Sequence, residues 1–184
     1  KLIKNLAKDK LKKVFLIGQS GSGKSVCGKI LSKKLNWDLL DTDKNLKDSQ
    51  EMSISNIFEK KGEAFFRSQE LKILNELLPR ENIVISTGAG LPSIKGCLEI
   101  MKFNGVVVWL KTSPIVIESR LNGEDESHRP LLFNKNESLL INLEKQLQKR
   151  YSVYSSADFT VTTDNREPDS ISSEICEIIG LKNG

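Results

Sequence analysis

Short apolar segments rich in β-branched residues alternate along the chain with longer segments whose apolar residues recur every three or four positions. The short segments predict buried strands at residues 14–17, 39–40, 83–86, 106–110 and 159–161. The longer segments predict helices at residues 24–35, 53–60, 63–78, 114–121, 140–154 and 171–179, and a further helix that begins at Pro92. This alternation indicates an α/β fold with a five-stranded, mainly parallel sheet flanked by helices.

The composition is typical of one globular domain without a membrane span. Of 184 residues, 38% are hydrophobic and 28% charged, and no apolar run approaches the roughly 20 residues that cross a bilayer. The net charge is +4, but residues 1–13 carry +5 and the remainder −1. We therefore interpret residues 1–13 as a solvated basic lead-in and expect no nucleic-acid or membrane partner. Three widely spaced cysteines favour a cytoplasmic setting, or an organelle stroma if a transit peptide has been removed.

A glycine-rich segment joins the first predicted strand to the first predicted helix. Its sequence, GQSGSGKS at residues 18–25, matches the phosphate-binding pattern G-x-x-x-x-G-K-[ST]. Glycines at this spacing let successive backbone N–H groups face phosphate oxygens at a helix N-terminus. Lys24 is expected to contact the β- and γ-phosphates, and the Ser25 hydroxyl to bind Mg²⁺. A turn that only connects two elements needs neither side chain, so the segment predicts a nucleotide site.

Other regions restrict the class of P-loop protein. A GTPase carries an Asn-Lys-x-Asp element after a late strand, whereas the similar string at residues 134–137 follows no predicted strand and ends in Glu137. A P-loop ATPase motor is normally larger and has an Asp-Glu pair at the end of a hydrophobic strand. The class that remains is a small kinase, in which residues outside the P-loop hold the second substrate.

Five further motifs follow the P-loop in order, and with it they resemble the shikimate kinase family over nearly the whole chain. They are Asp41-Thr42-Asp43, Phe66-Arg67-Ser68-Gln69-Glu70, Gly88-Ala89-Gly90, Arg129-Pro130-Leu131-Leu132, and Arg150 with Tyr154 and Ala157-Asp158. In the family the corresponding strings are D-x-D, F-R-x-x-E, a G-G-G turn, R-P-L-L of the lid, and R-x-x-x-Y. The resemblance implies transfer of the ATP γ-phosphoryl group to the 3-hydroxyl of shikimate, in aromatic amino-acid biosynthesis, by a mainly monomeric enzyme.

The resemblance also assigns roles that suit the substrate, a carboxylate with three ring hydroxyls. Arg67 and Arg150 would hold the carboxylate through paired hydrogen bonds, with Glu70 orienting Arg67. Asp41 and Asp43 are expected to face one side of an extended segment, where Asp43 would accept the proton of the attacking hydroxyl and Asp41 would approach Mg²⁺. The alternative for this pair is a helix cap. The expected substrate-binding residues are Asp43, Arg67, Gly88, Ala89, Gly90 and Arg150.

The polar segment at residues 121–133 resembles the family's lid, and its Arg129 is expected to close over the transferring phosphoryl group. The expected catalytic residues are Lys24, Asp43 and Arg129. The expected ATP-binding residues are Gly21, Ser22, Gly23, Lys24, Ser25, Val26, Arg120 and Arg129. The chain departs from the family pattern at Ala89 in the glycine turn, where the extra methyl group is tolerated if φ is negative.

We therefore predict one P-loop NTPase domain over residues 1–184 that acts as a shikimate kinase with ATP and Mg²⁺. A gluconate-type kinase and a catalytically idle nucleotide-binding relative are the alternatives. The combination of D-x-D, F-R-x-x-E and R-P-L-L argues against the first, and the presence of Lys24, Asp43 and Arg129 argues against the second. A nucleoside monophosphate kinase is disfavoured because no base-reading pocket is evident.

Overall fold

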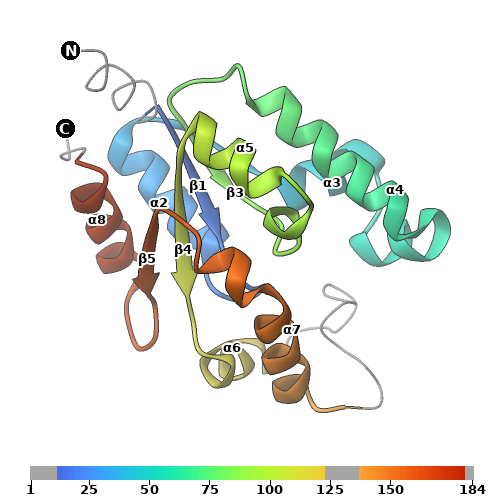
Figure 1. Ribbon diagram of the computed structural model, residues 1–184. Coiled ribbons are helices and arrows are strands. Elements are labelled where there is room, and N and C mark those ends of the chain that lie inside the picture. Colours follow the sequence, from blue (N-terminus) through green and yellow to red (C-terminus); the bar gives the residue numbers. More distant parts are fainter. Residues whose placement is uncertain (1–11, 123–136, 181–184) are drawn as a thin grey trace.

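A five-stranded sheet organises the protein, for which a computed structural model describes residues 12–122 and 137–180 (Figure 1). The strands are β1 (Lys13–Ile17), β2 (Asp38–Asp41), β3 (Ile83–Ser86), β4 (Val106–Lys111) and β5 (Phe159–Thr162). The helices are α2 (Lys24–Leu35), α3 (Thr42–Gln50), α4 (Ile54–Leu77), the 3₁₀ turn η1 (Leu91–Ser93), α5 (Cys97–Asn104), α6 (Pro114–Leu121), α7 (Leu139–Tyr154) and α8 (Pro168–Ile178). The strand order is β2-β3-β1-β4-β5 and every neighbouring pair is parallel, which confirms the predicted fold class.

Helices cover both faces of the sheet, because alternate residues of each central strand point to opposite sides. In β1, Val14 and Leu16 pack on one side in a cluster with residues of α2 and α8. Phe15 and Ile17 pack on the other side in a cluster with residues of α3, α4, α5 and α7. The result is a three-layer domain with the sheet buried between helices (Figure 1).

The carboxyl ends of all five strands lie at one edge of the sheet, since every strand runs in the same direction. The P-loop leaves β1 at this edge, Asp41 ends β2, and Thr87 follows β3. In the sheet, β2 and β3 lie to one side of β1, and β4 and β5 lie to the other. The P-loop, which follows β1, therefore lies where the strand order changes direction. Ligands of open α/β sheets bind at such a point.

Two local predictions were wrong. Residues 41–43 are not one extended segment, because a helix, α3, begins at Thr42 directly after β2. Asp41 starts that helix by accepting hydrogen bonds from the Asp43 and Lys44 N–H groups, both at 3.1 Å. The segment after Pro92 forms only the short turn η1, and the following helix begins at Cys97.

The two helical stretches predicted at residues 53–60 and 63–78 lie within α4, which is kinked at Gly62 (φ 81°, ψ 169°). In the described part of the chain, no helix combines the length and the apolar content that a bilayer crossing requires.

Candidate active site

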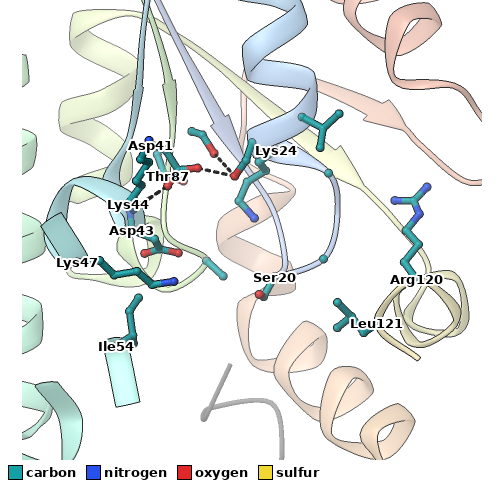
Figure 2. Close-up of a pocket in the computed structure, with 16 residues that line it drawn as sticks. Ser20, Lys24, Asp41, Asp43, Lys44, Lys47, Ile54, Thr87, Arg120 and Leu121 are labelled. Carbon is teal, nitrogen blue, oxygen red and sulfur yellow. Dashed lines mark hydrogen bonds between the residues drawn. The ribbon is translucent and has the colours of Figure 1, made fainter. Parts of the chain in front are cut away.

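A cavity of about 770 Å³ opens at the carboxyl edge of the sheet (Figure 2). It lies between the P-loop, the start of α3, the end of β3 and the end of α6. Its lining residues are Ser20, Gly21, Gly23, Lys24, Ser25, Val26, Asp41, Asp43, Lys44, Lys47, Ile54, Ser86, Thr87, Ala89, Arg120 and Leu121. The fold thus brings the P-loop, both aspartates of the D-x-D motif and Ala89 to one space.

The P-loop wraps around the ammonium group of Lys24. The side chain is 8% exposed, and Nζ donates to the carbonyls of Gly18 at 2.8 Å and Gln19 at 2.7 Å. Gly23, in the left-handed conformation with φ 93°, precedes the first residue of α2. A cation and a helix N-terminus therefore meet in one hollow, which is the arrangement that binds the phosphates of a nucleotide.

Ser25 and Asp41 form an oxygen pair beside the P-loop. The Ser25 hydroxyl donates to Asp41 Oδ2 and also lies 3.4 Å from the Ser86 hydroxyl. Oxygen atoms are the ligands that Mg²⁺ prefers, and this ion is usually held by one or two protein groups plus phosphates and water. The described residues contain no cluster of three or more His, Cys, Asp or Glu side chains able to enclose a metal. The pair fits Mg²⁺ shared with a bound nucleotide.

Asp41 acts as the helix cap that was the alternative interpretation of the D-x-D motif, and its role at Mg²⁺ stays a prediction. Oδ1 caps α3, as the bonds to the Asp43 and Lys44 N–H groups show, while Oδ2 accepts from Ser25. The cap fixes the carboxylate in one orientation, and it also places Asp43 in the first turn of the helix. The Asp43 side chain lines the cavity that faces the P-loop (Figure 2).

The turn at residues 88–90 is closely packed against charged side chains. A β-carbon built on Gly88 would lie 2.6 Å from Asp43 Oδ1 and 2.8 Å from Glu70 Oε1, and one on Gly90 would lie 2.9 Å from the Arg67 Cζ. A side chain at either position would displace the ends of these charged side chains from the turn. Ala89 carries its methyl group without left-handed backbone strain, because its φ is not positive.

Arg67 and Glu70 are paired on α4, as predicted. Arg67 Nη1 donates to Glu70 Oε2 at 2.6 Å, and the same guanidinium contacts the exposed Glu63 at 3.1 Å. The Glu70 side chain is only 2% exposed, and this burial, together with the nearby charge of Asp43, raises its pKa to about 7; Arg67 and Arg150 oppose the shift. Asp43, Arg67 and Arg150 are therefore within electrostatic reach of one carboxyl group, although neither arginine lines the P-loop cavity.

Of the two arginines predicted to bind ATP, Arg120 lies among the described residues and Arg129 does not. Arg120 lines the cavity and donates to the Thr163 carbonyl at 3.0 Å, close to the P-loop, where Ser22 O lies 3.5 Å away. Arg120 therefore lies beside the P-loop, and its contact with ATP stays a prediction. Arg129 and most of the predicted lid, residues 123–133, lie outside the described residues, so their roles stay predictions.

Several residues of the cavity were not predicted from the sequence. Lys44 and Lys47 come from α3, and Figure 2 shows Lys47 pointing into the pocket beside Asp43. Lys47 follows Asp43 by four residues, which would have indicated a shared helix face if α3 had been predicted. Ser86 is the last residue of β3 and pairs with Asp41, and Thr87 follows it; their position at the end of a buried strand was the available signal.

Known proteins resemble this chain along most of its length. A family model described as shikimate kinase matches residues 20–180. The shikimate kinase of Sulfurihydrogenibium sp. is 39% identical over 90% of this chain and 96% of its own length. The structure of the Acinetobacter baumannii shikimate kinase in complex with shikimate aligns with a TM-score of 0.86 at 31% identity, covering 94% of this chain and 96% of that one. The Aquifex aeolicus shikimate kinase structure aligns at 0.76 and 34% identity, covering 91% and 96%. These matches confirm the resemblance that the ordered motifs predicted.

Proposed function

The chain belongs to the shikimate kinase family, and from this membership we propose that it transfers the γ-phosphoryl group of ATP to the 3-hydroxyl of shikimate. As a member it is an ATP-dependent kinase. The single observation that carries the proposal is the position of Asp43, whose carboxylate faces the cavity formed by the P-loop. A hydroxyl held between Asp43 and a nucleotide on the P-loop would be in place to attack phosphorus.

On the acceptor side, we assign the substrate carboxylate to Arg67 and Arg150 and the ring hydroxyls to Asp43 and the 88–90 turn. Glu63 and Glu70 hold the Arg67 guanidinium in one orientation, which lowers the entropy lost on binding. Asp43 accepts the proton of the reacting hydroxyl as the bond to phosphorus forms. The close packing of Gly88 against Asp43 supports a shared pocket for these groups.

On the nucleotide side, Lys24 and the P-loop N–H groups hold the phosphates. Lys24 Nζ, which donates to the Gly18 and Gln19 carbonyls, would offset negative charge on the γ-phosphate. Ser25 and Asp41 would hold Mg²⁺, which supplies charge neutralisation of the phosphates when bound. Arg120 lies toward the nucleotide, and Arg129 would close over it from the lid.

Release of ADP from Mg²⁺·ATP tests the reaction, run in parallel with shikimate, gluconate, nucleoside monophosphates and no acceptor. We expect turnover with shikimate alone, which would also demonstrate that Ala89 is compatible with activity. Turnover with gluconate instead would retain the kinase and contradict the assignment of the ring hydroxyls. Tight ATP binding without turnover on any acceptor would contradict the proposed activity and favour an idle relative.

We further propose that the enzyme acts as a monomer in a cytoplasmic or stromal compartment, with small molecules as its only partners. The near-neutral charge of residues 14–184, −1 in total, supports the absence of a nucleic-acid surface on the folded body. Sedimentation of the purified chain in the presence and absence of substrates is the direct check on the monomer.

Because the pKa of the buried Glu70 is raised, we expect the protein to become less stable as the pH rises toward 7.5. Its pKa is about 7 in the folded protein against an ordinary value of 4.5, so between these values the folded state binds the extra proton. The free energy of unfolding should therefore decrease from pH 4.5 to pH 7.5, by on the order of 2 kcal/mol from this group. Urea denaturation of wild type and Glu70→Gln at both pH values isolates the contribution.

The matched control is Glu63→Gln, which removes the exposed carboxylate on the same guanidinium. It should keep the wild-type slope of stability against pH, whereas Glu70→Gln should flatten it. An identical slope in wild type and Glu70→Gln would mean that Glu70 titrates near its ordinary pKa.

A further inference from the structure

Tyr154 joins two elements that the proposed reaction uses but that lie far apart in the sequence. It is the last residue of α7 and is fully buried, with 0% exposure. Its hydroxyl donates to the carbonyl of Ala89 at 2.7 Å, across 65 positions of the chain. Four residues earlier, on the same helix, lies Arg150. One buried hydrogen bond thus connects the helix of Arg150 to the centre of the 88–90 turn.

The Tyr154 ring is held in place on its other side by the sheet. Its centroid lies 5.7 Å from that of Trp109, a β4 residue that is 3% exposed. A ring packed in this way has little freedom to rotate, so the position of its hydroxyl is set by the core. Burial raises the pKa of Tyr154 to about 12, while the positive charge of Arg150 and its hydrogen bond to the tyrosine oppose the rise. The hydroxyl therefore remains a donor at physiological pH.

The bond to Ala89 also determines where the next peptide N–H points. The peptide between Ala89 and Gly90 is trans, so its carbonyl and its N–H point in opposite directions. Because Tyr154 holds the carbonyl, the Gly90 N–H faces away from Tyr154, and among the described residues no acceptor pairs with it. Gly90 also packs against the guanidinium of Arg67. The Gly90 N–H group and the Arg67 guanidinium therefore lie at the same part of the turn.

We propose that Tyr154 is a positioning residue for the acceptor site, and that its hydroxyl fixes the 88–90 turn at a set distance from Arg150. This inference rests on the proposed function, because it takes the turn and Arg150 to bind shikimate. Tyr154 itself does not contact substrate. It acts through the Ala89 carbonyl and through the helix that carries Arg150. Loss of the hydroxyl should weaken shikimate binding at the acceptor site and leave ATP binding at the P-loop unchanged.

The test is steady-state kinetics of wild type, Tyr154→Phe and Tyr151→Phe, each with thermal unfolding measured alongside. Tyr154→Phe keeps the buried ring and removes only the hydroxyl, so we expect the KM for shikimate to rise about fivefold to tenfold while the KM for ATP stays within about twofold. Tyr151→Phe is the matched control. It makes the same chemical change on the same helix at a residue that is 47% exposed, and both KM values should stay near wild type.

The outcomes separate this inference from the proposed function. A wild-type enzyme that does not turn over shikimate would overturn both. An active wild type with an unchanged shikimate KM in Tyr154→Phe, even if its unfolding temperature falls, would overturn the positioning role alone and leave Tyr154 as a core residue. A rise of equal size in both KM values would also overturn it, because the change would then not be confined to the acceptor site.

Discussion

Asp43→Asn should abolish nearly all turnover while leaving the nucleotide site intact. Asp43 lines the cavity opposite the P-loop, in the first turn of α3, and asparagine has the same shape but cannot accept a proton. We expect kcat to fall by about 10³-fold, the range found when a general base is removed, with ATP affinity within about threefold of wild type. Single-turnover kinetics and ATP titration measure the two quantities.

The chain offers a control for this substitution on the same helix. Asp48 is exposed on α3 and outside the cavity, so Asp48→Asn should leave kcat unchanged. Asp43→Asn has a second expected effect, because the charge of Asp43 contributes to the raised pKa of Glu70. The pH range over which stability falls should therefore shift to lower pH. Substantial turnover in Asp43→Asn would remove Asp43 from the role of proton acceptor, and loss of ATP binding would place it in the nucleotide site.

The strands and the P-loop helix were predictable because each is determined by its own sequence. Residues 83–85 and 14–17 are continuous apolar runs rich in β-branched residues, which suit strands buried on both faces. The helix at residues 24–35 follows a motif whose function requires it. Helix α3 was missed because Asn45, Asp48 and Ser49 have low helix propensity, and its mean hydrophobic content is small. The Asp41 cap and the burial of Leu46 against the core stabilise it instead.

The features of the candidate site also fall into those that the local sequence predicts and those that it does not. Lys24, Ser25 and the Arg67–Glu70 pair are local in sequence, and a motif or an i,i+3 spacing identifies them. The Tyr154–Ala89 hydrogen bond and the raised pKa of Glu70 depend on how α4, α7 and the 88–90 turn pack together. No sequence pattern gives the burial of a carboxyl group, which is the largest cause of that shift. Features of this kind can be identified only from the three-dimensional structure.

Arg67→Ala should have the second-largest effect on the reaction, and it should act only on the acceptor side. The guanidinium is oriented by Glu63 and Glu70 and packs against Gly90. Removing a fork that holds a carboxylate should lower kcat/KM for shikimate by about 10²-fold, while the KM for ATP changes by less than about twofold. Kinetics with each substrate varied at saturation of the other make this measurement. An equal loss for both substrates would mean that Arg67 stabilises the fold as a whole and does not specifically bind the shikimate carboxylate.

Arg67→Lys separates the charge of Arg67 from its shape. Lysine restores a cation near Glu70, which is 2% exposed and would otherwise lose the partner that lowers its pKa, but lysine cannot donate two parallel hydrogen bonds. We therefore expect Arg67→Lys to recover most of the stability lost in Arg67→Ala at pH 7.5, yet to retain a shikimate KM at least about tenfold above wild type. Recovery of both properties would mean that charge alone binds the carboxylate. Recovery of neither would mean that the packing of the guanidinium against the 88–90 turn, rather than its pairing, is what the site requires.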